Sequence, residues 1–298
     1  MRVFLTGATG FIGARIVPEL LAAGHSVLGM TRSDAGARAL IDAGAEPFRA
    51  VLEDPTSVAA GAEQADAVIH TAFDHDFSSF VANCEKDRRV IQAIGTILKG
   101  SDRPILITSG TGLGAAAAGQ PATEDVANFD HPNPRVASEE AGAALLEAGI
   151  KVLVMRLPQV HDTHRQGLVS PYIVNARQRG AAAYVGDGLN RWPAAHVTDV
   201  ARLYRLAIEQ GKAGERFHAV AEEGVPAREI AAVVGAGLGV PVMSVAQEQA
   251  AEHFGWLAMF VGMDMPASSA WTRDRLGWSP SGRGMIADLR DMDYSEAP

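Results

Sequence analysis

Short apolar runs alternate with amphipathic stretches over the first half of the chain. Six of these runs have the length and side chains of buried strands, at residues 3–5, 27–30, 45–48, 67–70, 105–108 and 152–156. Between them apolar residues recur at helical spacing, and the predicted helices begin near Ile12, Asp34, Asp54, Ser79 and Arg135. Strands that alternate with helices form right-handed crossovers. The pattern therefore predicts an α/β fold with a doubly wound parallel sheet, covered by helices on both faces.

A glycine-rich turn follows the first predicted strand and leads into the first predicted helix. It reads Thr6-Gly7-Ala8-Thr9-Gly10-Phe11-Ile12-Gly13. Glycine allows a tight turn and a close approach of backbone N–H groups to a pyrophosphate, and the helix N-terminus adds unpaired donors. An ordinary glycine-rich turn is the alternative. The order of strand, turn and helix favours a dinucleotide cradle, and with it the Rossmann fold.

The pattern changes after residue 157, and residues 225–270 read as short helices. The residues that interrupt it are Pro158, Pro171, Gly186, Gly188 and Pro193. We expect a dinucleotide-binding domain over residues 1–157 and a smaller, discontinuous substrate lobe over most of residues 158–298. Residues 195–220 are expected to return to the first domain, with a helix that opens at Thr198 or Asp199 and runs to Glu209.

The end of the second predicted strand indicates which dinucleotide binds. An NAD site usually has an acidic residue there, which accepts hydrogen bonds from the ribose hydroxyls. This chain has Thr31-Arg32-Ser33 instead. A guanidinium beside small hydroxyl residues suits a 2′-phosphate, so we expect NADP(H) in preference to NAD(H). A solvated surface arginine is the alternative interpretation of Arg32.

Composition and charge argue against several classes of protein. The chain has 298 residues, 47% of them hydrophobic, which is enough for a large core. A net charge of −9 argues against a nucleic-acid partner. The apolar runs are too short to span a bilayer, and the chain starts in a strand instead of a signal peptide, so we expect no membrane partner. Its one cysteine, Cys84, cannot form an internal disulfide and fits a cytoplasmic location.

Taken together, these motifs resemble the extended short-chain dehydrogenase/reductase superfamily, the group that includes sugar-nucleotide epimerases, dehydratases and 3β-hydroxysteroid dehydrogenase-like proteins. The resemblance covers essentially the whole chain, through the glycine-rich turn and residues 51–54, 69–72, 107–109, 155–161, 186–193 and 196–200. It places Leu52 beside the adenine. It implies cofactor contacts at Gly7, Thr9, Gly10, Phe11, Ile12, Gly13, Arg32, Leu52, Thr71, Ala72, Phe73 and Pro158.

The catalytic residues depart from that superfamily's pattern. A serine after the fifth strand works there with a Tyr-x-x-x-Lys pair, whose tyrosine gives a proton to the alkoxide and whose lysine lowers the tyrosine pKa. Ser109 matches the serine, and alignment of the next helix on Ser138 puts Arg135 at the tyrosine and Glu139 at the lysine. The residues four places after the four tyrosines are Ala, Gly, Ile and Pro, so this chain contains no such pair.

Arg135 and Glu139 have two interpretations. The Arg135 guanidinium stays protonated and cannot act as the acid, but its charge suits a developing oxyanion. Alternatively, the two residues form a helix ion pair at four-residue spacing. The proton for catalysis then has to come from Thr111, His161, Tyr172, Tyr184 or a water molecule. His161 is the candidate with an ordinary pKa near neutrality, although a lone histidine is more often a hydrogen-bonded structural residue.

A second group of residues, Arg191, Trp192 and His196, matches the segment that lines the substrate pocket in the resembling superfamily. An arginine beside an aromatic ring can bind an anionic or planar substrate. Packing of Trp192 between the two lobes is the alternative. We predict substrate contacts at Thr111, Tyr172, Arg191 and Trp192, and catalytic roles for Ser109, Arg135 and His161.

The sequence therefore predicts an NADP(H)-dependent oxidoreductase that acts on a small carbonyl or alcohol substrate with a non-standard proton donor. A non-catalytic dinucleotide-binding redox sensor is one alternative, because the usual tyrosine and lysine are missing. An NAD-dependent sugar-nucleotide epimerase or dehydratase is a weaker one, because those reactions depend on the tyrosine. The sequence leaves open the substrate, the direction of reaction and whether the chain forms a homodimer.

Overall fold

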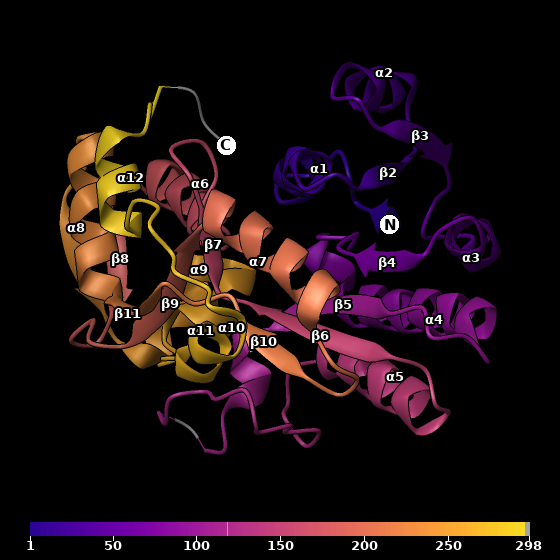
Figure 1. The fold of residues 1–298 in the computed structure, drawn as a ribbon. Helices are drawn as coiled ribbons and strands as arrows, with labels where there is room; N and C mark the ends of the chain where they lie inside the picture. Colours follow the sequence, from indigo (N-terminus) through magenta and orange to yellow (C-terminus); the bar gives the residue numbers. More distant parts are fainter. Residues whose placement is uncertain (118, 296–298) are drawn as a thin grey trace.

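A seven-stranded parallel sheet organises the chain in the computed structural model, which describes residues 1–117 and 119–295 (Figure 1). The strand order is β10-β6-β5-β4-β1-β2-β3. All six predicted strands are confirmed, and the three-residue strand β10 joins them beside β6. The bounds are β1 (Arg2–Thr6), β2 (Ser26–Thr31), β3 (Glu46–Arg49), β4 (Ala67–His70), β5 (Ile105–Gly110), β6 (Val152–Leu157) and β10 (Arg216–His218).

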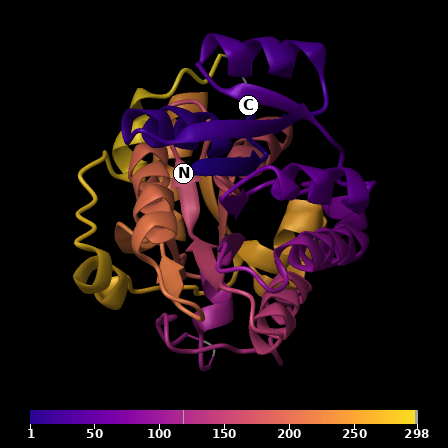
Figure 2. The same cartoon turned by 45° about the vertical axis from the view of Figure 1, so that its right-hand side comes forward.

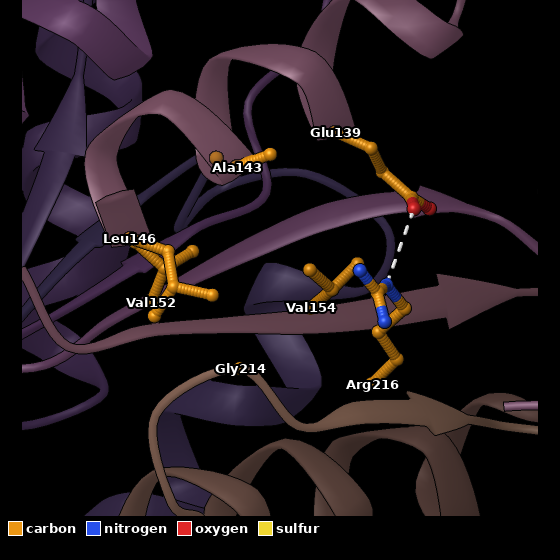
Figure 3. Close-up of a pocket in the computed structure, with 8 residues that line it drawn as sticks. Glu139, Ala143, Leu146, Val152, Val154, Gly214 and Arg216 are labelled. Carbon is orange, nitrogen blue, oxygen red and sulfur yellow. Dashed lines mark ion pairs between the residues drawn. The ribbon is translucent and has the colours of Figure 1, made fainter. Parts of the chain in front are cut away.

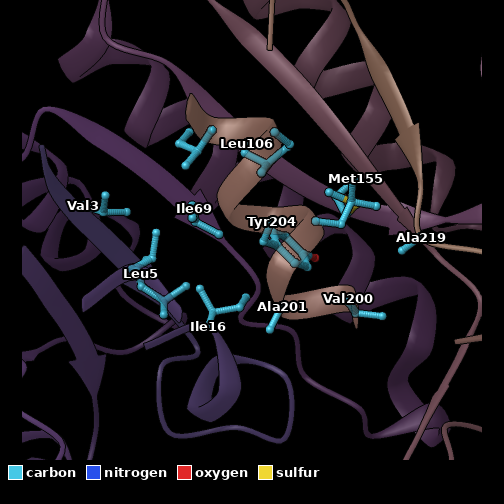
Figure 4. Close-up of a cluster of buried hydrophobic side chains, with 14 of the residues drawn as sticks. Val3, Leu5, Ile16, Ile69, Leu106, Met155, Val200, Ala201, Tyr204 and Ala219 are labelled. Carbon is cyan, nitrogen blue, oxygen red and sulfur yellow. The ribbon is translucent and has the colours of Figure 1, made fainter. Parts of the chain in front are cut away.

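Helices cover both faces of this sheet, as a doubly wound fold requires. Val3 and Leu5 point to one face and pack in a cluster with Tyr204 (Figure 4), whereas Phe4 and Val68 pack in the cluster on the other face. The first face is covered by α1 (Gly13–Ala22), α2 (Asp34–Asp42) and α7 (Val197–Gln210). The second is covered by α3 (Pro55–Glu63), α4 (Phe80–Leu98) and α5 (Val136–Glu147).

The C-terminal part of the chain has its own hydrophobic cluster. Figure 1 shows its helices α8 and α12 on the side of the molecule away from α2 and β3, and Figure 2 shows the same fold with the indigo N-terminal strands turned to the front. Its strands form a three-stranded sheet of β7 (Gln159–His161), β9 (Arg191–His196) and β11 (Glu222–Pro226), and a parallel pair of β8 (Ala182–Val185) and β12 (Val242–Val245). Its helices are α6 (Val169–Arg179), α8 (Ala227–Leu238), α9 (Ala250–Phe254), α10 (Ala258–Val261) and α12 (Met285–Asp291), whereas α11 (Ala270–Leu276) packs its Leu276 into the cluster of the large sheet that contains Tyr204.

Two local predictions differ from the structure. Residues 225–270 contain short helices, but also the strands β11 and β12 and the longer helix α8. Helix α7 begins one residue before the predicted start, because His196 caps it by accepting the Thr198 N–H. Asp199 lies buried inside the helix and instead accepts the backbone N–H groups of Ser281 and Gly282. The domain division stays a prediction. No helix among the described residues is long and apolar enough to cross a bilayer.

A buried ion pair joins β6 to α5. Arg156 is 0% exposed and donates from Nε and Nη2 to the two Glu139 carboxylate oxygens, both at 2.7 Å. Its Nη1 also donates to the carbonyls of Thr123 and Val126. Beside this pair, Figure 3 shows Glu139 and Arg216 at one end of a cavity of about 20 Å³. The space suits about one water molecule, so it is no substrate site.

His218, in β10, completes this buried cluster. Its Nδ1 lies 2.8 Å from the Ser268 carbonyl and therefore donates, which leaves Nε2 as the acceptor from Arg156 Nη1 at 3.3 Å. A second proton on Nε2 would point at the guanidinium. Burial, reinforced by the charge of Arg156, lowers the pKa of His218 to about 4.

We expect His218 to make the protein less stable in acid. Between pH 6.5 and 4 the unfolded histidine is protonated and the folded one is not, so stability falls with falling pH. The loss through this residue reaches about 3 kcal/mol. Urea unfolding from pH 8 to pH 4 should show a shallower pH dependence in His218→Gln. The control is His164→Gln, an exposed histidine, and equal slopes in the two variants would contradict the assignment.

Candidate functional site

The glycine-rich turn after β1 has the geometry of a phosphate cradle. Gly7 has a φ of 68°, and the Gly10 N–H donates to its carbonyl at 2.9 Å. A Cβ on Gly13 would lie 2.1 Å from that same carbonyl, so only glycine lets α1 begin this close to the turn. Thr9 and Gly10 are exposed, and Phe11 and Ile12 are half-buried. The turn therefore presents an accessible edge at the N-terminus of α1.

The loop after β4 is fixed against this turn by Thr6, the last residue of β1. The N–H groups of Thr71 and Ala72 both donate to Thr6 Oγ1 at 3.1 Å. The Thr71 hydroxyl donates to the Thr6 carbonyl at 2.7 Å. A Cβ on Gly7 would clash with these two residues. Thr71 and Ala72, predicted from the sequence as cofactor contacts, thus adjoin the cradle.

The ends of β2 and β3 lie on the same side of the sheet, because the strands are parallel. Arg32 is exposed and has no ion pair within the described residues, and Ser33 caps α2 by accepting the Gly36 N–H. Leu52 is half-buried after β3. Lys86 connects this region to the β4 loop, because it pairs with both Glu53 and Asp74 at 2.8 Å.

A chain of buried hydrogen bonds leads from Thr6 to Arg135. Thr6 Oγ1 lies 2.8 Å from His70 Nδ1, and His70 Nε2 lies 2.9 Å from Asp87 Oδ1. The other oxygen of Asp87 accepts from Arg135 Nη1 and from the Ser138 hydroxyl, both at 2.6 Å. Burial alone would raise the pKa of Asp87. The Arg135 charge and the bonds from His70 and Ser138 outweigh it and hold that pKa well below its usual range.

Arg135 lies just before α5, at the ends of β4 and β5. It also donates from Nη2 to the Thr108 carbonyl at 2.9 Å, and its guanidinium covers the Phe73 ring at 4.0 Å. A guanidinium has five N–H donors. Three of them are used by Asp87, Ser138 and Thr108, so two remain without a partner among the described residues.

Ser109 faces a different partner. Its hydroxyl donates to Glu139 Oε1 at 2.6 Å and accepts from the Gly110 N–H at 2.7 Å. Burial opposes ionisation of Glu139, but the paired Arg156 keeps the pKa of this carboxyl lowered. The helix ion pair between Arg135 and Glu139 that the sequence allowed is not formed. Arg135 pairs with Asp87, and Glu139 pairs with Arg156.

No hydrogen bond, ion pair or ring contact in the described chain joins the predicted residues of the C-terminal part to Ser109 or Arg135. His161 is buried and bonds Asp288 at 2.8 Å, and Tyr172 donates to the Ala183 carbonyl at 2.9 Å. Arg191 forms a two-point ion pair with Asp264. Trp192 packs in the C-terminal hydrophobic cluster. Of the remaining residues, Thr111 is buried after β5, Tyr184 is half-buried in β8, and Pro158 separates β6 from β7.

Sequence reasoning missed Asp87 and the aromatic residues that follow Phe73. Asp87 had a detectable signal, because it shares the buried stripe of α4 with Cys84, Val90 and Ile91, where an acid needs a buried partner. No comparable signal exists for the contact of Phe77 with Trp256, whose rings stack at 4.4 Å. The second residue is too distant in the chain.

Comparisons with known proteins identify the family of the chain. The model of the NAD dependent epimerase/dehydratase family matches residues 3–220. An uncharacterized protein of Schizosaccharomyces pombe is 44% identical over 295 residues, which are 99% of this chain and 100% of that protein. The 2-alkyl-3-oxoalkanoate reductase of Stenotrophomonas maltophilia is 27% identical, with 81% and 77% of the two chains covered.

Solved structures show the same fold. The dTDP-glucose 4,6-dehydratase DesIV of Streptomyces venezuelae, solved with NAD and TYD bound, is 20% identical and has a TM-score of 0.76, with 98% of this chain and 96% of that one covered. The family match spans the cradle, the β4 loop and Arg135. The chain therefore belongs to the NAD dependent epimerase/dehydratase family within the extended short-chain dehydrogenases/reductases, and is an NAD(P)-dependent oxidoreductase of that type.

Proposed function

We propose that the protein is an NADP(H)-dependent oxidoreductase that interconverts a small carbonyl compound and its alcohol, without the usual tyrosine proton donor. The observation that carries the proposal is the cradle at Gly7–Gly13, with the β4 loop and Arg135 fixed beside it by one hydrogen-bond chain. The reductase relative supports this reaction class.

The residues present fit a dinucleotide. Gly7, Gly10 and Gly13 leave room for a pyrophosphate where side chains would fill the turn. Arg32, an exposed cation without an ion pair in the described chain, is placed to bind the 2′-phosphate. On the adenosine side we assign further contacts to Thr9, Phe11, Ile12 and Leu52. We assign the nicotinamide side to Thr71, Ala72, Phe73 and Pro158. When bound, the nicotinamide supplies or accepts the hydride.

Arg135 is the group we place on the substrate oxygen. The single O–H of Ser109 donates its hydrogen bond to the Glu139 carboxylate, so no donor remains on Ser109 for a substrate oxygen. Arg135 has two unused N–H donors and a geometry fixed by three bonds. Fixed donors of this kind stabilise an oxyanion at little reorganisation cost. In this proposal Ser109 holds Glu139 and the start of the loop after β5.

The proton has to come from a different side chain or from water. Burial raises the pKa of Tyr172 well above the ordinary tyrosine value, and its hydroxyl already donates to the Ala183 carbonyl. His161 is fully buried and cannot exchange a proton with a substrate in the proposed site. His75 instead lies in the β4 loop, with its ring 5.3 Å from that of Phe73. His75 is exposed at the surface, but desolvation of its ring, followed by the charge of Arg135, lowers its pKa. We assign proton exchange with the substrate to His75.

A redox sensor is the second candidate function. Both ionisable residues at the usual tyrosine and lysine positions are locked in buried ion pairs, Arg135 with Asp87 and Glu139 with Arg156. A sensor binds oxidised and reduced cofactor with different affinities, binds a protein partner and turns over no substrate. Absence of NADPH oxidation with every carbonyl tested, together with tight NADPH binding, would favour it.

Gly13→Ala tests the cradle. The new Cβ would overlap the Gly7 carbonyl, so either the turn opens or α1 shifts, and the amide donors lose their alignment. We expect NADPH affinity, measured by calorimetry, to fall by about 100-fold or more, roughly 3 kcal/mol. Gly112→Ala is the control, since its Cβ meets nothing within 4 Å. Unchanged NADPH affinity in Gly13→Ala would contradict the assignment of this turn as the pyrophosphate site.

Arg32→Glu tests the choice of cofactor. The carboxylate repels a 2′-phosphate and can accept hydrogen bonds from ribose hydroxyls. We expect the ratio of NADPH to NADH affinity to drop by about 100-fold. The exposed Arg38→Glu, on α2, controls for net charge. A similar ratio of NADPH to NADH affinity in the two variants would show that Arg32 does not bind the 2′-phosphate.

His75→Gln tests proton delivery. The pKa of His75 is lowered. Carbonyl reduction needs the protonated ring and should slow as the pH rises through that pKa, whereas alcohol oxidation should speed up. In His75→Gln the kcat for reduction should fall by about 100-fold and lose this pH dependence. His164→Gln serves as the exposed control. A full pH profile in His75→Gln would assign the proton to water.

A further inference from the structure

Five aromatic residues lie together where the β4 loop meets the C-terminal part. The 3₁₀ turn η1 (Phe77–Ser79) supplies Phe77, whose ring stacks on Trp256 at 4.4 Å and 9°. Trp256 belongs to the 3₁₀ turn η4 (Gly255–Leu257). Phe80 and Phe260 lie 5.2 and 6.2 Å from Phe77, and Phe73 lies 6.2 Å from Phe80. We call Phe73, Phe77, Phe80, Trp256 and Phe260 the aromatic row.

The row is not an ordinary part of the core. Only 6% of the chain is aromatic, yet two short segments contribute all five rings. Trp256 is 40% exposed, and the neighbouring Met259 of α10 is 55% exposed. Large apolar side chains left open at a junction of two segments are typical of a ligand or partner site. Methionine adapts its shape to different apolar ligands.

One end of the row coincides with the proposed site of hydride transfer. Phe73 follows Thr71 and Ala72 directly, and these two residues are held against the phosphate cradle by Thr6. Arg135 covers the Phe73 ring, and its two unused N–H donors lie at this end. A molecule whose carbonyl oxygen meets Arg135 would therefore extend along the aromatic row.

Charges around the row indicate what kind of molecule fits. Cations close to it are already neutralised by carboxylates: Arg135 by Asp87, Lys86 by Asp74 and Glu53, and Arg191 of the predicted substrate segment by Asp264. Arg165, whose charge reaches His75, has no ion pair within the described residues. One arginine is too little charge for a diphosphate, which needs several cations or backbone donors. An anionic nucleotide sugar is therefore disfavoured.

We propose that the aromatic row is the substrate subsite, and that the substrate is an uncharged carbonyl compound with a flat aromatic or similarly apolar group beside the carbonyl. The inference rests on the proposed oxidoreductase function. A flat group adds to an existing stack of rings in offset or edge-to-face geometry, without the need for a charged partner.

Trp256→Ala tests the subsite with a matched pair of substrates. We expect the KM of NADPH-dependent reduction of 2-naphthaldehyde to rise about 5- to 10-fold, with kcat nearly unchanged. The KM of butanal and the affinity for NADPH should stay at their wild-type values. Trp271→Ala is the control, because Trp271 is as exposed (42%) but stacks on Phe217 elsewhere. Phe77→Leu, which keeps an apolar side chain, should resemble Trp256→Ala.

Equal effects on both aldehydes, or equal behaviour of the two tryptophan variants, would overturn the subsite. So would preferred turnover of a nucleotide sugar over 2-naphthaldehyde. A direct binding measurement separates this inference from the proposed function. Saturation-transfer NMR with 1-naphthol and the NADP⁺ complex should detect binding that Trp256→Ala removes and Trp271→Ala retains. Naphthol binding of this kind without turnover of any aldehyde would contradict the oxidoreductase proposal but support the subsite. Normal turnover without naphthol binding would contradict the subsite alone.

Discussion

The Thr6 hydroxyl connects the two sides of the site. It accepts from the amides of Thr71 and Ala72, and these two bonds orient its own proton toward His70 Nδ1. His70 must then donate from Nε2 to Asp87, which binds Arg135. Each bond of this chain then has one defined donor and one defined acceptor. A buried network is stable only when all its members are satisfied, so the position of Arg135 depends on the end of β1.

Two buried carboxylates, Asp87 of α4 and Glu139 of α5, each pair with an arginine. Asp87 takes the charge of Arg135 on one side, and Glu139 takes that of Arg156 on the other. Removing one partner of such a pair would leave a buried charge, at a cost of about 3–5 kcal/mol. The two pairs therefore keep the pKa of both carboxyl groups, Asp87 and Glu139, below the ordinary value despite their burial. Arg135 and Glu139 are therefore both held in ion pairs, and in the proposed reaction the proton is exchanged by another group.

The sequence predicted the parts of the fold that depend on local pattern. Six strands, the glycine-rich turn and the helices between them follow from apolar spacing and glycine chemistry within about 20 residues. It did not predict β10, which has only three residues and is defined by its pairing with β6. Nor did it predict that Arg135 and Glu139 bind separate partners, since helical spacing allows their pairing equally well. The stack of Phe77 on Trp256 and the bond of His161 to Asp288 join distant segments, and nothing near either residue signals its partner.

The proposed ligands also explain where unpaired charge is found. Arg32, at the end of β2, is exposed and without an ion pair in the described chain, whereas Arg135 and Lys86 near the end of β4 are neutralised. An unpaired cation attracts a phosphate strongly, whereas a paired one keeps its hydrogen-bond donors and attracts a free anion far less. With the overall charge at −9, anions would be held mainly at the cradle and Arg32. The aromatic row at the other end would favour uncharged molecules, because an anion would lose hydration there and gain at most one unpaired cation, Arg165.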